Sequence, residues 1–180
     1  MTFEEAFRID NTDKLTHGYH EYYQELIGKE PINSVLEIGI FKGNSLKAWQ
    51  KVWPFASVEG IELDKIPEHI MEKFTVYRHD STNIHNAKLL NKNYDLIVDD
   101  ASHHWKNQLD TFNNYYEKAN KFYVIEDLLG EYGQNKILEH LPKDVLAKSI
   151  LRVSKGPTRT FTHSEHIEHE TTYRILLIKK

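Results

Sequence analysis

Short apolar runs alternate with helical patterns along most of the chain. Five runs have the length and composition of buried strands, and they cover 34–39, 57–63, 74–79, 94–99 and 122–127. The stretches between them carry apolar residues at helical spacing, as in Leu46, Trp49 and Val52 ahead of Pro54. This alternation is typical of an α/β fold with a parallel sheet.

Two longer amphipathic stretches are expected to form helices against this sheet. The first precedes the sheet and has a buried stripe over 19–27. The second keeps one apolar face from Trp105 to Ala119, which corresponds to about four helical turns. Both lengths are typical of helices that cover the face of a sheet.

The alternation breaks towards the C-terminus. After a short predicted helix near 132–141 come two apolar runs, 145–153 and 172–179, with no helical pattern between them. Two successive strands without a crossover helix are expected to pair antiparallel. The sequence therefore predicts one α/β domain over 1–180, with a mainly parallel sheet that ends in an antiparallel hairpin and with helices on both faces.

Composition and charge narrow the classes of function. Hydrophobic residues make up 39% and charged residues 28%, as in a globular domain. The net charge of -4 offers no basic surface, so neither nucleic acid nor a membrane is expected as a partner. The chain has no cysteine, which excludes disulfides and zinc–thiolate sites and suits a reducing, cytoplasmic location. Its first residues are acidic and lack the apolar stretch of a signal peptide or anchor.

A glycine-containing turn follows the first predicted strand. Glu37, Gly39 and Gly43 stand in the pattern E-x-G-x-x-x-G, and Ser45 follows at the start of the next helix. Glycines at this point let the backbone turn sharply and approach a ligand closely, although a glycine pair alone is equally typical of a structural turn. The spacing differs from the G-x-G-x-x-G of nicotinamide enzymes, so a nicotinamide reductase is a distant alternative.

Acidic residues end the next two strands at the same edge of the predicted sheet. Glu62 stands 19 residues beyond Gly43, close to the position at which an acid hydrogen-bonds ribose hydroxyls in dinucleotide folds. Asp64 is able to share or take this role. Asp80 and Ser81 follow the third strand, where they suit contacts with an adenine ring and equally suit helix capping. We expect a nucleoside to bind in this crevice.

Four carboxylates are expected to meet where the fourth and fifth strands end, namely those of Asp99, Asp100, Glu126 and Asp127. Carboxylates in one place repel each other unless protons or a cation compensate. A hard divalent ion such as Mg²⁺ suits carboxylate oxygens. The alternative is that these acids cap the helices predicted to start near 105 and 128, which is reasonable for one acid and less so for all four.

A histidine pair follows these acids in the same loop. Near neutral pH an imidazole is able to take a proton from a hydroxyl, and a neighbouring metal ion lowers the pKa of that hydroxyl. His103 is the preferred base, because it stands three residues after Asp100 and the two are able to face one site across a single turn. His104 is the alternative.

A second histidine-rich stretch connects the last two predicted strands over 155–171. His163, His166 and His169 are spaced by three, which would group them on a helix as a metal site. The segment is interleaved with glutamates, however. We therefore expect a solvent-exposed loop or a border of the substrate site.

Six segments carry a resemblance to a known family. They are TDKLTHGYHEYY (12–23), VLEIGIFKGNSLKAW (35–49), GIELD (60–64), HDST (79–82), DLIVDDASHH (95–104) and VIEDL (124–128). In this order they resemble the class I S-adenosylmethionine-dependent methyltransferases, and among them the metal-dependent sugar O-methyltransferases of macrolide tailoring, of the mycinamicin and tylosin type. The pairing of D-D-x-S-H with E-D is more specific than the glycine turn, and Ala101 stands where relatives usually carry glycine.

The resemblance implies a Rossmann-like methyltransferase fold with S-adenosyl-L-methionine as cofactor and Mg²⁺ as metal. The residues expected to bind the cofactor are Glu37, Gly39, Gly43, Ser45, Glu62, Asp64, Asp80, Ser81, Asp99 and Tyr19. Asp100, Glu126 and Asp127 are expected to hold Mg²⁺, and His103 is expected to act as the general base beside Asp100. The segment 1–30, which includes His17 and Tyr19, is expected to form a helical lid over the cofactor.

These expectations combine into one leading function. It is Mg²⁺-dependent O-methylation of a sugar or another small hydroxylated metabolite, with a histidine base. The alternatives are a metal-independent methyltransferase that acts on nitrogen or oxygen of a small molecule, and a non-catalytic module that binds S-adenosylmethionine. The sequence leaves open which acceptor is methylated and whether the chain forms a homo-oligomer.

Overall fold

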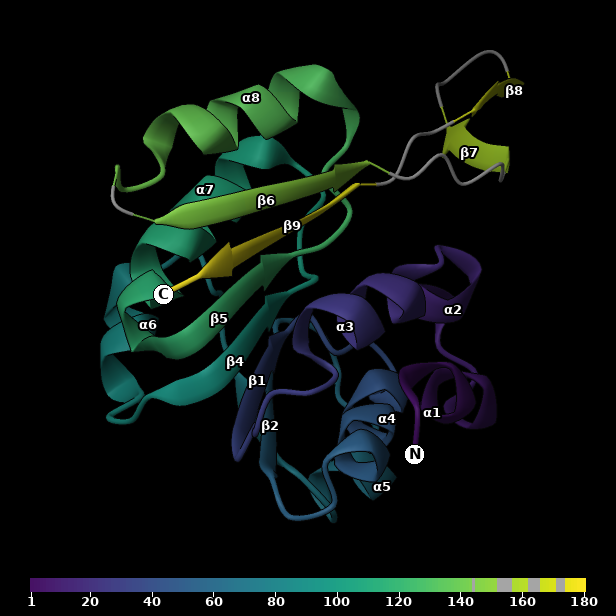
Figure 1. Cartoon of the computed structure of the whole chain (residues 1–180), viewed down its shortest axis with the longest axis vertical. Helices are drawn as coiled ribbons and strands as arrows, with labels where there is room; N and C mark the ends of the chain where they lie inside the picture. Colours follow the sequence, from purple (N-terminus) through teal and green to yellow (C-terminus); the bar gives the residue numbers. More distant parts are fainter. Residues whose placement is uncertain (144, 152–156, 162–165, 171–173) are drawn as a thin grey trace.

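A seven-stranded sheet forms the centre of the molecule (Figure 1). The structure, a computed structural model, describes residues 1–143, 145–151, 157–161, 166–170 and 174–180, and over 146–151, 157–161 and 166–170 it describes the backbone. The strands of the sheet are β1 (Ser34–Ile38), β2 (Ser57–Glu62), β3 (Thr75–Arg78), β4 (Tyr94–Asp99), β5 (Ala119–Ile125), β6 (Leu146–Leu151) and β9 (Arg174–Lys179). Their order is β3-β2-β1-β4-β5-β9-β6.

The sheet has the predicted mixture of strand directions. The strands β1 to β5 pair in parallel, while β9 runs antiparallel to both β5 and β6. The expected antiparallel hairpin at the end of a mainly parallel sheet is therefore confirmed. The chain order reverses between β1 and β4, which is where open α/β sheets bind their ligands.

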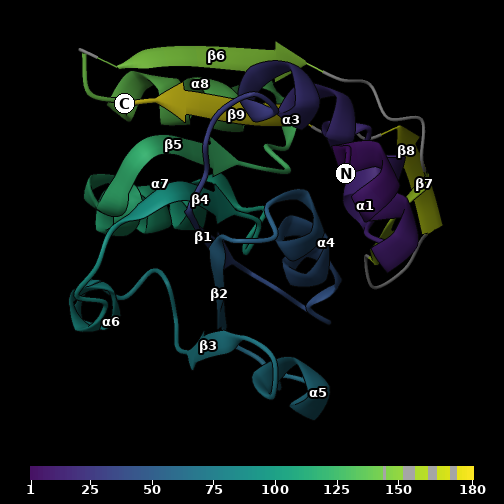
Figure 2. The same cartoon turned by 60° about the horizontal axis from the view of Figure 1, so that its bottom comes forward.

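Helices cover both faces of this sheet (Figures 1 and 2). They are α1 (Phe3–Asp10), α2 (Asp13–Thr16), α3 (Tyr19–Ile27), α4 (Asn44–Val52), α5 (Glu68–Met71), α6 (Ile84–Leu89), α7 (Trp105–Tyr115), the short 3₁₀ helix η1 (Tyr116–Lys118) and α8 (Gly130–His140). Within the described ranges, none of these helices has the length and apolarity to span a bilayer.

Side chains along the buried strands alternate between two hydrophobic clusters, one on each face. Val35 and Val124 belong to the cluster that also contains residues of α1, α3 and α4. Leu36 and Ile97 belong to the cluster that contains residues of α7 and α8. Because successive strand side chains point to opposite faces, this alternation also decides on which side the acid at each strand end lies.

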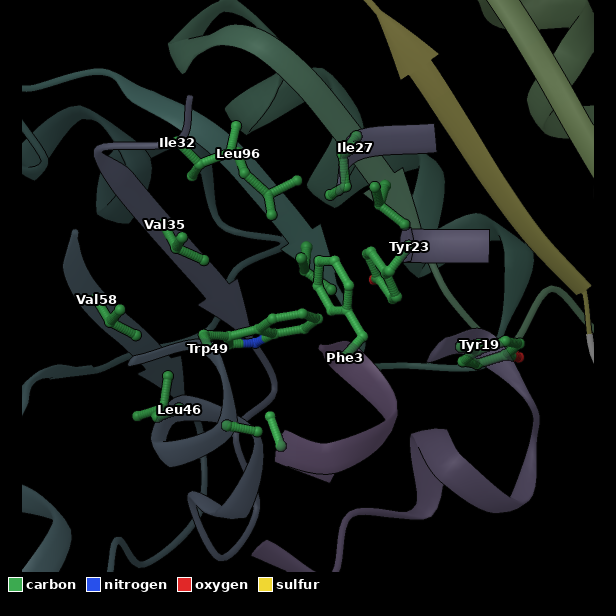
Figure 3. Packing of buried hydrophobic residues seen from close by; sticks show 14 of the residues in the cluster. Phe3, Tyr19, Tyr23, Ile27, Ile32, Val35, Leu46, Trp49, Val58 and Leu96 are labelled. Atoms are coloured by element: carbon green, nitrogen blue, oxygen red, sulfur yellow. The ribbon is translucent and has the colours of Figure 1, made fainter. Parts of the chain in front are cut away.

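The N-terminal helices pack on the sheet through aromatic rings. Phe3 stacks on Tyr23 with ring centroids 5.6 Å apart, and Trp49 of α4 meets Tyr23 edge-on at 5.0 Å (Figure 3). All three rings are buried, and such pairs add stability beyond the burial of their area. This cluster fixes α1 and α3 against the body of the molecule. Tyr19 lies at its edge (Figure 3).

Two predicted elements differ from the structure. The helix expected from Trp105 to Ala119 ends at Tyr115, and Ala119 instead begins β5, where it pairs with Tyr94 of β4. In the connection over 155–171, the described residues form two strands rather than a loop, β7 (Pro157–Phe161) and β8 (His166–Glu170), which pair antiparallel outside the main sheet. His163 lies outside the described residues.

Candidate active site

A cavity of about 720 Å³ lies at the carboxyl ends of the parallel strands. Its walls come from the turn after β1, the ends of β2 and β3, the loop after β4, and residues 11–13 between α1 and α2. The sequence-predicted residues that line it are Gly39, Ser45, Glu62, Asp64, Asp80, Ser81, Asp100, His103 and Asp127. The expected crevice at the strand ends is thus a single cavity that reaches from the ends of β2 and β3 to the acidic loop.

Close packing of two backbones explains why a glycine follows β1. Gly39 has φ +86°, and a Cβ there would lie 2.4 Å from the carbonyl oxygen of Asp100. Gly43, with φ +73°, faces the flexible side chain of Ile70 instead and lies just outside the cavity wall. Only glycine adopts the Gly39 conformation without a clash, so the turn and the acidic loop are held in direct contact.

Glu62 organises the rim of the cavity. Its carboxylate accepts hydrogen bonds from three backbone N–H groups, those of Phe41 at 2.7 Å, Leu63 at 2.8 Å and Asp64 at 3.0 Å. The first of these bonds holds Phe41 in a left-handed conformation with φ 48°. A carboxylate has about four acceptor positions, so Glu62 keeps capacity for a ligand hydroxyl.

Asp80 and Ser81 shape the wall after β3. Asp80 Oδ1 accepts hydrogen bonds from the backbone N–H and the hydroxyl of Thr82, at 2.9 and 2.8 Å. Ser81 Oγ lies 3.0 Å from the hydroxyl oxygen of Thr111 on α7. The cap of α6 is Asn83, so capping of that helix does not explain Asp80 or Ser81. Both remain available to a ligand in the cavity.

The strand-end acids point to opposite faces of the sheet. Glu37 and Glu126 lie on the face of the N-terminal helices, as the alternation along β1 and β5 requires, and Asp100 meets them there. Asp99 points the other way: it is 1% exposed, and burial raises its pKa well above the usual value. Within the described chain, Asp99, Glu37 and Glu126 lie outside the cavity wall. Their expected ligand contacts stay predictions.

A buried lysine stands at the centre of the acids on that face. The Nζ atom of Lys14, from α2, lies 2.5 Å from Asp100 Oδ2, 2.5 Å from Glu126 Oε2 and 3.2 Å from Glu37 Oε1. Burial by itself would lower the pKa of the Lys14 ammonium, but the three carboxylates hold it well above its usual value. Burial also raises the pKa of Asp100 and Glu126, since one ammonium does not compensate all three acids.

Asp127 joins the N-terminal segment to the acidic loop. Its Oδ1 accepts a hydrogen bond from the hydroxyl of Tyr19 at 2.5 Å, and Nδ1 of His17 lies 3.5 Å from the same oxygen. Its Oδ2 lies 3.4 Å from Nε2 of His103. Asp127 has φ 50°, a left-handed conformation that aspartate tolerates better than most residues. Tyr19 thus touches the site through Asp127 and does not itself line the cavity.

The described residues contain one group with the spacing of a metal site. Ligand atoms of Asp100, His103 and Asp127 all lie within 4.8 Å of one another. Two carboxylates suit a hard ion such as Mg²⁺, which keeps several waters, so this donor set fits the expected metal. Glu126 is directed elsewhere, because its oxygens contact Lys14 and the hydroxyl of Tyr23. The capping alternative does not hold, since α7 and α8 follow His104 and Leu129.

The two histidines of the loop occupy different environments. His103 lines the cavity, and its side chain is 45% exposed. The ring of His104 stacks on Trp105 with centroids 6.0 Å apart, and His104 is not among the described residues of the cavity wall. Only His103 is therefore placed to reach a molecule bound in the cavity.

Sequence reasoning expected the N-terminal segment near this site but did not identify the residues through which it contributes. Asn11, Thr12 and Asp13 line the cavity, and Lys14 compensates the acids behind it. The need for a cation among the acids was a usable clue, but it does not say which element supplies that cation. Phe41, at the rim, was missed as well.

Several solved structures resemble the chain. MycE methyltransferase from the mycinamycin biosynthetic pathway, in complex with Mg, SAH and mycinamycin VI, has a TM-score of 0.64 and 20% identity over 71% of this chain and 37% of its own. The plantazolicin methyltransferase BpumL, with SAH and a monoazolic desmethylPZN analog, has a TM-score of 0.65 and 16% identity over 99% and 85%. TrmN from Thermus thermophilus has a TM-score of 0.61 and 13% identity over 89% and 47%.

The matches in structure are not accompanied by matches in sequence. No family profile and no curated protein sequence matches the chain. The chain spans 37–53% of the length of three MycE structures, so it corresponds to part of those proteins. The resemblance expected from the motifs is confirmed: the chain has the fold of the class I S-adenosylmethionine-dependent methyltransferases.

Proposed function

We propose that the chain is an S-adenosylmethionine-dependent methyltransferase that uses Mg²⁺ to methylate a hydroxyl of a sugar or another small metabolite. One observation carries the proposal. A single cavity is lined at one end by Glu62 and Asp80, which suit a nucleoside, and at the other by Asp100, His103 and Asp127. The structural neighbours support it, because MycE was crystallised with Mg and SAH and BpumL with SAH.

The cofactor would lie across the carboxyl ends of β1, β2 and β3. Glu62 and Asp64 would accept hydrogen bonds from the ribose hydroxyls, and Asp80 with Ser81 would lie beside the adenine. The methionine end would pass over Gly39, where the backbone approaches most closely. A volume of about 720 Å³ lies within the range of small-molecule sites and leaves room for an acceptor beside the cofactor.

The acidic end of the cavity would carry out the chemistry. Asp100 and Asp127 would hold Mg²⁺, which when bound polarises the oxygen of the acceptor. Because Nε2 of His103 faces Asp127 at 3.4 Å, Nδ1 is the ring nitrogen left to take the hydroxyl proton. S-adenosylmethionine would supply the methyl group: a lone pair of the acceptor oxygen would form the new O–C bond, and the electron pair of the broken C–S bond would stay on sulfur. Asp127 then stabilises the protonated imidazole.

A metal-independent methyltransferase is the second candidate. The observation that favours it is Lys14, which already supplies one positive charge to the acids. Activity on a panel of small hydroxylated and amino acceptors, with and without a chelator, separates the two. Full activity in the presence of the chelator would exclude the Mg²⁺-dependent mechanism.

Calorimetry with S-adenosylmethionine and S-adenosylhomocysteine is the direct test of the proposed function. Binding of both is expected, and Asp80→Asn should weaken it because Asp80 lines the cavity. Asp110→Asn, on α7 and outside the described cavity wall, serves as the matched control and should bind normally. If the unaltered protein binds neither compound, the proposal is wrong. Binding without methyl transfer to any acceptor would instead indicate a non-catalytic cofactor-binding module.

A further inference from the structure

Three carboxylates from separate parts of the sheet converge on one lysine nitrogen. We call Glu37 at the end of β1, Asp100 after β4 and Glu126 after β5 the inner carboxylate group. Nζ of Lys14 contacts all three, at 3.2, 2.5 and 2.5 Å, and the lysine side chain is 2% exposed. The lysine comes from a four-residue helix that is remote from all three acids in the sequence.

The inner carboxylate group surrounds a single positive charge. Oxygens of Asp100, Glu126 and Glu37 all lie within ion-pair distance of Nζ. Glu37 is fully buried, and its Oε1 lies 3.2 Å from the Lys14 ammonium. A buried carboxylate is costly unless hydrogen bonds or a cation compensate it. Here the ammonium is that cation.

The remaining acid oxygens face away from Lys14. The outer group, defined as Asp100, His103 and Asp127, has the spacing of a metal site and includes no atom of Glu126. Oε1 of Glu126 accepts a hydrogen bond from the hydroxyl of Tyr23, while its Oε2 contacts Lys14. Both oxygens of Glu126 contact Lys14 and Tyr23 away from the cavity, whereas Asp127, whose oxygens contact Tyr19 and His103, lines the cavity.

We propose that the Lys14 ammonium takes the place of a cation in the inner carboxylate group, so that a divalent ion binds only in the outer group and Glu126 is not an ion ligand. Ion binding by the outer group rests on the proposed function. Compensation of the inner carboxylates by Lys14 rests on the contacts of Lys14 alone.

Removal of the lysine charge is the test. Lys14→Met keeps an unbranched side chain, one atom shorter, and leaves the inner carboxylates without compensation, so they become able to bind a divalent ion. Calorimetric titration with Ca²⁺ and with Mn²⁺, without S-adenosylmethionine, should show an additional equivalent or binding on the order of tenfold tighter than in the unaltered protein. Lys14→Arg keeps the positive charge and should show no such gain.

Lys51→Met is the matched control. Lys51 also makes a 2.5 Å ion pair, with Asp10, and joins α4 to the end of α1, but it lies away from the inner carboxylates. It should show no gain in ion binding. The double variant Lys14→Met with Glu126→Gln should lose most of the gain, because one inner ligand is removed. Glu126→Gln alone should leave ion binding of the unaltered protein within about threefold.

A second measurement tests the proposal if Lys14→Met does not fold on its own. Since ion binding stabilises the folded state, millimolar Ca²⁺ or Mn²⁺ should then restore cooperative thermal unfolding. The proposal is overturned if the folded variant binds these ions as the unaltered protein does, or if the variant stays unfolded in their presence. An unaltered protein that binds neither S-adenosylmethionine nor Mn²⁺ would contradict the proposed function, while the gain in Lys14→Met would still measure this inference.

Discussion

Gly39 lies directly against Asp100, since a Cβ on the glycine would come within 2.4 Å of the Asp100 carbonyl oxygen. The backbone N–H of Asp100 in turn donates to the carbonyl of Ile38 at 2.8 Å. The glycine turn after β1 and the loop that carries the acids are thus one packed unit. A change in either should be felt by the other.

Gly39→Ala should destabilise the fold and disturb the acidic loop. The left-handed conformation and the clash with backbone atoms act together, so we expect a loss of about 3 kcal/mol or more in the free energy of unfolding. Gly130→Ala is the matched control, because Gly130 also has a positive φ but a Cβ there meets no described atom within 4 Å. That variant should lose only about 1 kcal/mol. Urea unfolding of both variants checks the difference, and equal losses would contradict the packing argument.

Tyr23→Phe should destabilise the protein because it removes a hydrogen-bond donor from a buried acid. The hydroxyl of Tyr23 donates to Oε1 of Glu126, and the expected loss is about 1–3 kcal/mol. Tyr123→Phe is the control: Tyr123 is equally buried, yet its hydroxyl has no hydrogen-bond partner in the described chain. We expect this second change to be neutral or stabilising in the same urea experiment. A larger loss in Tyr123→Phe would show that removal of a buried hydroxyl, and not of its hydrogen bond to Glu126, decides the outcome.

Glu59 of β2 should make the fold sensitive to acid. Burial alone would raise the pKa of its carboxyl, but hydrogen bonds from Lys92 and Tyr94 hold the pKa below the usual 4.5. A lowered folded-state pKa contributes stability that is complete above the ordinary pKa and is lost as the pH falls through the lower value. Glu59→Gln should therefore be less stable than the unaltered protein near neutral pH. The difference between their free energies of unfolding should shrink as the pH falls below the ordinary pKa of the carboxyl.

Urea midpoints measured from neutral pH to below the ordinary pKa of Glu59 check this prediction. Tyr94→Phe removes one donor, at 3.0 Å from Oε2 of Glu59, and should shrink the acid-sensitive part of the stability without abolishing it. A gap between Glu59→Gln and the unaltered protein that stays constant across this range would contradict the assignment.

His103→Gln and His104→Gln should separate the two histidines of the loop. Loss of a general base lowers kcat by about 10²–10⁴-fold, and this is expected for His103 only, because His103 lines the cavity while His104 stacks on Trp105. The Kd for S-adenosylmethionine should change little in either variant. Initial rates with a saturating acceptor provide the measurement, and equal losses in both variants would remove the role assigned to His103.

Much of the sheet could be predicted because most of its strands have a recognisable pattern in their own residues. The β4 strand matches the predicted 94–99, since its three consecutive apolar residues, Leu96, Ile97 and Val98, suit a strand buried on both faces. The predicted start of β5 was wrong because Ala119 fits the helical face of α7 as well as it fits a strand. Pairing with Tyr94 across the sheet decides that position, and this contact is not visible in the local pattern.

The site could be predicted as far as strand ends determine it. The positions of Glu62, Asp80, Asp100 and Asp127 at one edge follow from parallel strands, and all four line the cavity. The expectation that Asp99 joins these acids does not hold, because adjacent residues of a strand point to opposite faces of the sheet. The opposite direction of Asp99 follows from the alternation along β4, a clue that was present in the sequence.

Lys14 is the residue that local pattern does not reveal. It stands in a helix of four residues with no amphipathic repeat, and its partners follow it by 23 to 112 positions in the sequence. The need for a positive charge depends on all the acids of the site together. Tertiary packing supplies this charge, because it brings the Lys14 side chain from α2 to Glu37, Asp100 and Glu126.

The short helix α2 gives the beginning of the chain an unusual importance. Loss of the first residues of a protein is ordinarily tolerated, since few contacts are broken at a frayed end. Here a chain shortened beyond Lys14 would lose the ammonium that compensates three buried acids. The effect on stability should resemble that of a mutation in the interior. Proteolysis beyond Lys14 should thus destabilise the protein in two ways, because it removes this charge from the interior and also removes Phe3, whose ring stacks on Tyr23.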